Sequence, residues 1–314
     1  MGFVDGQVRV RVPATSANLG PGFDTLGLAL SLYDDVAGVV VPDGLHIEID
    51  GEGDAQVARN ETHLVVRAMR AAFDALGETP GGLSLSCVNR IPHSRGLGSS
   101  AAAIVAGVLL ARGLVRDGAL RLDDGAVLAL ACAVEGHPDN VASCLLGGLT
   151  IAWTADGSAR AVRRDLDPAI FPVALIPPYG ASTAVARGLL PAAVPHGDAA
   201  FAAGRAALLV AALTGTPQAL LDATEDRLHQ TFRRSAMPDT LALVEKLRAS
   251  GHPAVISGAG PSVLVLARGE VEAERVEAQV PSEWSVRRLV VDTRGARVVP
   301  DATVEVVGDG LVDR

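Results

Sequence analysis

A glycine-rich segment with two adjacent serines, PHSRGLGSSAAA, occupies residues 92–103. An alternating apolar run at 83–88 precedes it and an alanine-rich stretch at 99–114 follows it, so we expect a strand, a loop and a helix. Gly96 and Gly98 permit a tight bend, and the free N–H groups of a helix's first turn favour an anion. The segment therefore predicts a phosphate-binding loop. An ordinary glycine turn with a serine N-cap is the alternative that spacing alone leaves open.

The rest of the sequence limits which nucleotide sites and partners are expected. Neither GxxxxGKS/T nor GxGxxG occurs in this segment, and the single lysine, Lys246, is the only candidate for a lysine-dependent mechanism. A net charge of -9 without a basic run argues against nucleic acid as a partner. No stretch approaches the roughly 20 uninterrupted apolar residues of a spanning helix, and the first residues carry no export signal. We therefore expect no membrane partner and a cytoplasmic location.

Two groups of elements are expected to position the loop, because 314 residues exceed the usual size of one core. The first group has strands at 8–12, 36–41, 45–49, 83–88 and 149–153, and helices at 61–76, 99–114 and 124–135. The polar segment 156–167, followed by Pro168, predicts the domain junction. The second group has strands at 172–176, 254–257, 262–267 and 286–291, and helices at 181–190, 197–213, 217–221, 238–250 and 271–280. The prediction is an α+β protein with domains at 1–160 and 161–314.

Three motifs in a fixed order point to a family. PxxxGLGSSAA at 92–102 resembles the phosphate-binding second motif of the GHMP kinases; VPATSANLGPGFD at 12–24 resembles the first motif and ISGAGPS at 256–262 the third. EGHPDNVA at 135–142 resembles the homoserine kinase branch of this family, although Ser-Cys at 143–144 replaces the Pro-Ala of many members, a change expected to affect packing.

The resemblance implies a fold and an activity. The fold would be the two-domain GHMP kinase fold, with a ribosomal protein S5 domain 2-like N-terminal domain and a ferredoxin-like C-terminal domain. The activity would be ATP-dependent phosphorylation of the L-homoserine hydroxyl in threonine biosynthesis.

The same resemblance implies which residues bind the nucleotide and its metal. The ATP-binding residues would be Pro92, His93, Ser94, Arg95, Gly96, Leu97, Gly98, Ser99, Ser100, Ala101 and Ala102. Ser100 and Glu135 would bind Mg²⁺. For Glu135 the alternative is a solvated carboxylate at a helix end.

Substrate contacts follow from the chemistry of homoserine, which has an ammonium, a carboxylate and a hydroxyl. Asp24 would bind the ammonium and Asn18 would orient the hydroxyl, although Asn and Asp are also common turn residues. A guanidinium fork matches a carboxylate, so Arg187 and Arg233 would bind that end, with Arg234 as a rival to Arg233. The remaining expected substrate contacts are Thr183, His137, Asp139, Gly258 and Gly260.

Catalytic roles are expected for Asn18, Asp139, Asn140 and Arg187. Asp139 is the candidate general base, but we favour the alternative in which the γ-phosphate receives the proton. His137 could equally be a hydrogen-bonded structural residue beside Pro138. Two other functions stay open: a GHMP kinase for another small alcohol such as shikimate or mevalonate, and a nucleotide-binding regulator without catalysis. A homodimer is the candidate assembly, and the sequence does not reveal the oligomeric state.

Overall fold

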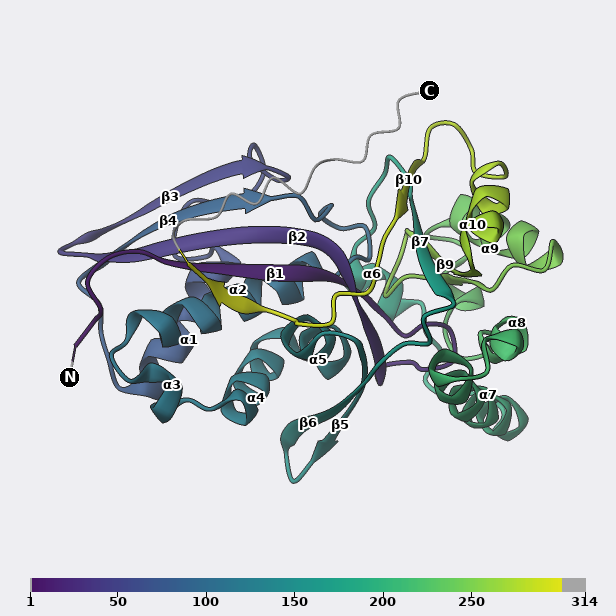
Figure 1. Ribbon diagram of the computed structural model, residues 1–314, viewed down its shortest axis with the longest axis horizontal. Helices are drawn as coiled ribbons and strands as arrows, with labels where there is room; N and C mark the ends of the chain where they lie inside the picture. The colour runs from purple at the N-terminus through teal and green to yellow at the C-terminus, as the bar shows by residue number, and fades with distance from the viewer. Residues whose placement is uncertain (1, 301–314) are drawn as a thin grey trace.

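The structure, a computed structural model, describes residues 2–300 and contains two β-sheets side by side (Figure 1). The first sheet has the order β11-β1-β2-β4-β3, with β5 attached to β2 and β6 to β5. Its strands are β1 (Val8–Ala17), β2 (Leu26–Val41), β3 (Gly44–Gly51), β4 (Gly82–Asn89), β5 (Leu149–Ala155), β6 (Ser158–Arg164) and β11 (Arg297–Val299). β3 and β4 are parallel and are connected through helix α1 (Leu64–Leu76), whereas the other pairs are antiparallel.

β1 carries the chain from the far end of this sheet toward the second one. Val8, Val10 and Val12 are buried, and the arginines between them are half-buried, as period-two alternation requires. The pairing with β2 shifts register between Pro13 and Ala14, and β1 then continues to Ala17. The loop between β1 and β2 therefore lies at the junction of the two sheets.

Helices cover one face of the first sheet (Figure 1). They are α1, α2 (Ser99–Leu114), α3 (Gly118–Arg121), α4 (Asp124–Glu135) and α5 (Pro138–Leu146). α2 is buried on most sides, and a Cβ on its Gly107 would overlap the Val65 carbonyl of α1. Close packing of α1 on α2 therefore fixes the direction in which the first turn of α2 points.

The second sheet is fully antiparallel with the order β10-β7-β9-β8, which is the ferredoxin-like order for a βαββαβ chain. Its strands are β7 (Ile170–Ile176), β8 (Ala254–Ile256), β9 (Val263–Arg268) and β10 (Ser285–Arg288). The helical elements are α6 (Thr183–Gly188), α7 (His196–Thr214), η1 (Pro217–Ala219), α8 (Leu220–Ala223), η2 (Thr231–Arg233), α9 (Pro238–Ala249) and α10 (Glu270–Glu277). Within residues 2–300, α7 is the one helix that meets length and composition criteria for a membrane span, a test that helices of soluble proteins also pass.

Several segments differ from the expected elements, and residues 156–167 and 138–146 differ most clearly. Residues 156–167 were expected to be a polar junction, but Ser158–Arg164 forms β6, which pairs with β5 as a hairpin. An edge strand that is half exposed tolerates the arginines that made this segment look like a linker. Residues 138–146, to which we assigned no structure, form α5, with Pro138 in its first turn.

The domain boundaries stay a prediction. β6 ends the first sheet at Arg164 and β7 begins the second at Ile170, but β11 returns to pair with β1. Residue 1 and residues 301–314 of the expected domains lie outside the described part of the chain.

Candidate active site

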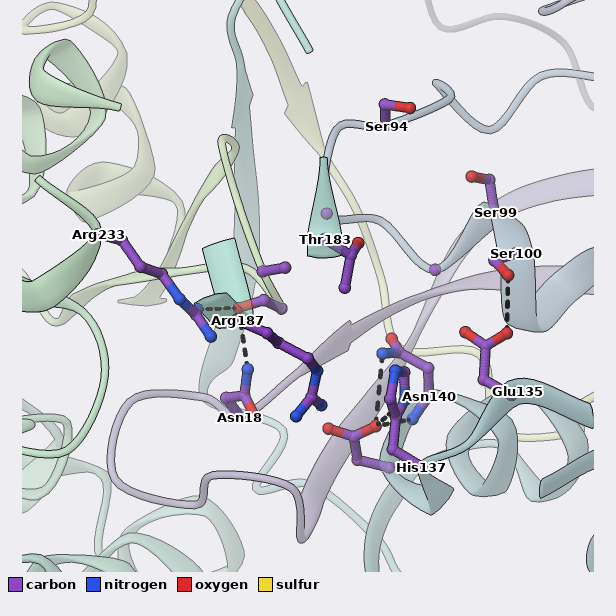
Figure 2. Close-up of a pocket in the computed structure, with 15 residues that line it drawn as sticks. Asn18, Ser94, Ser99, Ser100, Glu135, His137, Asn140, Thr183, Arg187 and Arg233 are labelled. Carbon is purple, nitrogen blue, oxygen red and sulfur yellow. Dashed lines mark hydrogen bonds and ion pairs between the residues drawn. The ribbon is translucent and has the colours of Figure 1, made fainter. Parts of the chain in front are cut away.

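A cavity of about 300 Å³ opens between the two sheets, and most of the residues singled out in the sequence line it (Figure 2). The lining comes from the β1–β2 loop, the segment before α2, the ends of α4 and α5, α6, η2 and the β8–β9 loop. The lining residues are Asn18, Ser94, Gly96, Gly98, Ser99, Ser100, Glu135, His137, Asp139, Asn140, Thr183, Arg187, Arg233, Gly258 and Ala259.

The expected phosphate loop runs into the N-terminus of α2. Gly98 has φ 73 and is followed directly by the helix, whose first turn has no side-chain cap and no acidic residue. Free amides and the positive end of the helix dipole therefore face the cavity. A Cβ on Gly96 would overlap the Ser257 carbonyl, and one on Gly98 would overlap the Thr15 hydroxyl. Both positions require glycine for packing as well as for access to a ligand.

Ser100 and Glu135 meet at one end of the cavity (Figure 2). The Ser100 hydroxyl donates to Glu135 Oε2 at 2.7 Å. Burial raises the pKa of Glu135, while the Ser100 hydrogen bond opposes this. Among residues 2–300 no group of three or more His, Cys, Asp or Glu side chains could hold a metal by itself. The two oxygen ligands fit a hard cation that takes its remaining ligands from phosphates and water.

The start of α5 brings three polar side chains to the cavity. Asp139 is 2% exposed and accepts the Asn140 N–H at 2.8 Å. His137 Nδ1 lies 3.4 Å from Asp139 Oδ1, without hydrogen-bond geometry, and the Asp139 carboxylate raises the pKa of His137. The Thr15 hydroxyl donates to Asn140 Oδ1 at 2.7 Å, which directs the Asn140 NH₂ group toward Asp139.

The loop between β1 and β2 supplies Asn18 and Asp24. The Asn18 amide donates to the Gly258 carbonyl at 2.9 Å and accepts the Asp24 N–H at 3.0 Å. Asp24 does not line the cavity itself. Instead its carboxylate forms a two-point ion pair with Arg187 of α6, at 2.6 and 3.1 Å. The two groups expected to bind opposite ends of homoserine therefore bind each other in this structure.

Arg233 lines the cavity and is 1% exposed. It donates to the Gly258 carbonyl at 2.9 Å, its Nε has no hydrogen-bond partner, and no carboxylate of residues 2–300 pairs with it. Burial, with a smaller contribution from Arg187, lowers the pKa of Arg233 to about 10. Arg234, its rival in the sequence, is half exposed and pairs with Glu245.

A second, mainly apolar cavity of about 250 Å³ adjoins the first and shares Ser94, Ser99 and Ser100 with it. Its other lining residues are Val12, Asp34, Val36, Val57, His63, Leu64, Val65, Asn89, His93 and Ala103. Asp34 Oδ1 accepts the N–H groups of Arg90 and Ile91 at 2.6 and 2.9 Å, and burial raises the pKa of Asp34 to about 6. Burial lowers the pKa of His63 and of His93.

Comparison with known proteins identifies the family. Residues 63–148 match the GHMP kinases N terminal domain and residues 206–286 match the GHMP kinases C terminal domain. The chain is 59% identical to the homoserine kinase of Streptomyces coelicolor, over 94% of this chain and 96% of that protein. The chain belongs to the GHMP kinase family. The homoserine kinase of Clavibacter michiganensis is 49% identical over 97% of this GHMP kinase and 96% of its own length.

A solved structure of homoserine kinase from Cytophaga hutchinsonii shares the fold. Its TM-score is 0.80 at 24% identity, covering 93% of this chain and 97% of that one. The GHMP kinase fold expected from the motifs is confirmed, and the two sheets belong to its two characteristic domains.

Several residues expected to contact ligands do not line the first cavity of this GHMP kinase. Leu97, Ala101 and Ala102 are buried in the core. The Arg95 guanidinium turns away and donates to the carbonyls of His93, Pro177 and Pro178. Pro92 and Arg95 line a separate pocket, and Gly260 packs on Met237. His93 lines the second cavity instead of the first.

Sequence reasoning also missed side chains that this site uses. Thr15 lies inside the first motif, and its position at the inner end of β1 was the available signal. The lining of the apolar cavity comes from strands β1, β2 and β4, the segment before α1, the first turn of α1, the β4–α2 loop and α2. No local sequence pattern predicts a cavity built from so many separate segments.

Proposed function

We propose that this GHMP kinase transfers the γ-phosphoryl group of ATP to the side-chain hydroxyl of L-homoserine, giving O-phospho-L-homoserine and ADP. The observation that carries the proposal is that one cavity joins a phosphate-type loop to two guanidinium groups suited to a carboxylate, Arg187 and Arg233. Asp24, which is suited to an ammonium, is paired with Arg187. Relatives named homoserine kinase, at up to 59% identity, support the same acceptor.

ATP would lie across the two cavities. Its phosphates would follow Gly96–Ser100, where the first amides of α2 offer donors to an anion. Its nucleoside would occupy the apolar cavity, because the serines shared by both cavities give the phosphates and the base one continuous path. This orientation leaves the γ-phosphate between Ser100 and the acceptor residues.

Ser100 and Glu135 would hold Mg²⁺ on the phosphates. The 2.7 Å contact between their oxygens places two suitable ligands at the phosphate end of the cavity. When bound, the metal would neutralise charge on the transferring phosphoryl group. Ser100 would supply a neutral hydroxyl ligand and Glu135 a carboxylate ligand.

The acceptor would bind by replacing the Asp24–Arg187 ion pair with contacts to its own charged groups. Arg233 is a buried cation that pairs with no carboxylate of residues 2–300, so the homoserine carboxylate is its natural counter-ion. The homoserine ammonium would then take Asp24, and Arg187, released from Asp24, would share the carboxylate with Arg233. Thr183 at the start of α6 would add a hydroxyl contact, and Asn18 would orient the acceptor hydroxyl.

The acceptor proton would leave on a phosphoryl oxygen. Asp139 Oδ1 already accepts the Asn140 N–H and lies close to His137, so this carboxylate is engaged in holding the start of α5. Asn140, fixed by Thr15, would face the transferring group as a donor. Catalysis would then rest on alignment and electrostatic stabilisation rather than on a strong base.

A substrate panel tests this function. Purified protein with Mg-ATP is assayed for ADP release and phosphoester formation with L-homoserine, D-homoserine, shikimate and mevalonate. We expect turnover with L-homoserine to exceed that with each other alcohol. Turnover of another alcohol in its place would indicate a different GHMP kinase, and ATP binding without stimulated turnover would indicate the non-catalytic regulator.

A further inference from the structure

The segment from Asp226 to Arg233 belongs to the C-terminal domain and faces the β1–β2 loop at residues 18–24, which is called the acceptor loop below. Asp226 accepts the N–H groups of Leu228, His229 and Gln230, which fixes the backbone of this turn. Gln230 in turn accepts the Ile256 N–H at 2.6 Å. The turn therefore presents its side chains from a rigid base.

His229 is completely buried and contacts the acceptor loop directly. Its Nε2 lies 2.7 Å from the Gly20 carbonyl. A carbonyl only accepts, so Nε2 carries the hydrogen. Burial lowers the pKa of His229, which favours the neutral ring. The ring also stacks on Phe23, with centroids 5.0 Å apart and an interplanar angle of 29°.

The loop that His229 contacts has a backbone that needs support. Asn18, Leu19 and Asp24 have φ of 70°, 50° and 53°, a region that residues other than glycine seldom occupy, although Asn and Asp do so more often than the others. Such conformations persist only where neighbouring structure holds them. Gly20, with φ 87°, packs so closely on the Thr224 carbonyl that a Cβ there would lie 2.7 Å away.

Two of these residues with positive φ are the candidate acceptor ligands. Asn18 lines the cavity, and Asp24 pairs with Arg187, whose guanidinium carbon lies 5.6 Å from the Phe23 ring centre. His229 itself does not line the cavity. It touches the loop at Gly20 and Phe23, which lie between Asn18 and Asp24 in the chain.

We propose that His229 is a positioning residue that fixes the loop 18–24 so that Asn18 and Asp24 meet the acceptor. The identity of the acceptor rests on the proposed function, whereas the anchoring of the loop does not. Because the contact acts on acceptor ligands alone, its loss should weaken acceptor binding and leave nucleotide binding unchanged.

Two variants separate the hydrogen bond from ring packing. His229→Phe keeps an aromatic ring against Phe23 and removes the donor, whereas His229→Gln keeps an N–H donor at similar reach and removes the ring. We expect His229→Phe to raise the KM for L-homoserine about tenfold, the effect of leaving a buried carbonyl unpaired, with the KM for ATP unchanged. His229→Gln should restore most of the acceptor KM. The control is His196→Phe, at an exposed position on α7.

Amide hydrogen exchange of the full chain without ligands supplies a readout independent of activity. Peptides covering 18–26 should exchange faster in His229→Phe than in wild type, while peptides of α2 should not change. Unchanged exchange of 18–26, or equal rises in both KM values, would overturn the proposal. Wild-type protein inactive on L-homoserine would refute the proposed acceptor, and the exchange result would still decide whether His229 anchors the loop.

Discussion

Arg187 and Asp24, 163 residues apart in the chain, form a two-point ion pair at the acceptor side of the cavity. Both side chains are about one-third exposed, at 35% and 36%, so the pair is accessible to a ligand. A zwitterion could replace both partners at once, its ammonium on Asp24 and its carboxylate on Arg187. An acceptor with one charge would leave the other side chain unpaired, so the pair favours amino acids over simple alcohols.

Replacement of Arg187 should affect the acceptor and spare the nucleotide. Arg187→Ala removes a carboxylate ligand and leaves Asp24 without its partner. Because the pair is partly solvated, we expect the KM for L-homoserine to rise about tenfold, with little change in the KM for ATP. Steady-state kinetics with each substrate varied in turn measures both values. Arg160→Ala, which removes an exposed arginine from the β5–β6 hairpin, serves as the control. Equal rises in both KM values would exclude a specific acceptor role for Arg187.

Arg233 should show the opposite effects on stability and on binding. Its lowered pKa means that burial of the charge costs free energy in the absence of a counter-ion. Arg233→Met removes that charge and one hydrogen bond to Gly258, so we expect the free energy of unfolding to rise by about 1–2 kcal/mol. The KM for L-homoserine should rise about a hundredfold, because a buried carboxylate would lose its cation.

Urea unfolding and kinetics on the same preparation measure the two effects of Arg233→Met. Arg234→Met is the matched control, because Arg234 is half exposed and pairs with Glu245 on the surface. A destabilised Arg233→Met with normal acceptor binding would show that Arg233 supports the fold and not the ligand.

The sequence predicted the parts of the site that lie in contiguous motifs. The loop before α2, the Glu135–Asn140 segment and the β8–β9 loop all line one cavity, because each motif contains the glycine, proline or capping residue that shapes it. The expected boundaries of α2 and α4 are confirmed. Both helices are rich in residues with high helix propensity and have clear termini in the sequence.

Relations between distant segments could not be predicted in this way. The Asp24–Arg187 pair, the Thr15–Asn140 bond and the contact of His229 with Gly20 each join segments more than 100 residues apart. The first and third of these contacts depend on how the two sheets meet, and the second depends on how α5 packs against β1. Local sequence periodicity encodes neither arrangement. β6 and β11 were missed because short edge strands with arginines have no apolar alternation.

Glu135 should control the metal requirement. Glu135→Gln removes the negative ligand and keeps the size of the side chain, so we expect the Mg²⁺ concentration for half-maximal activity to rise on the order of tenfold. Burial raises the pKa of Glu135, so its ionised form lowers stability above that pKa, and the glutamine should not lower the melting temperature. Mg²⁺ titration of activity, with exposed Glu245→Gln as control, measures the effect. An unchanged Mg²⁺ dependence would remove Glu135 from the metal site.

Asp34 should make the protein less stable as pH rises, the opposite of the effect of carboxyl groups whose pKa is lowered by folding. Its pKa is about 6 in the folded protein against 3.8 for an unperturbed carboxyl, so the folded state holds the proton longer. Stability should therefore fall as pH rises from about 4 to about 6, by at most about 3 kcal/mol, and the loss should persist above pH 6. Asp34→Asn keeps an oxygen for the Arg90 and Ile91 amides, both of which bond to one oxygen, and removes the charge.

We expect Asp34→Asn to melt at a higher temperature than wild type at pH 8 and at nearly the same temperature at pH 4. Asp35→Asn is the matched control of opposite sign. Burial opposes ionisation of Asp35, but hydrogen bonds from Arg11 and Arg90 outweigh it and lower the pKa of Asp35. Removing that charge should therefore destabilise the protein at pH 8 and much less at low pH, where the unfolded carboxyl is protonated. A lower melting temperature of Asp34→Asn than of wild type at pH 8 would show that the ionised Asp34 is compensated in the folded protein and that its pKa is not raised.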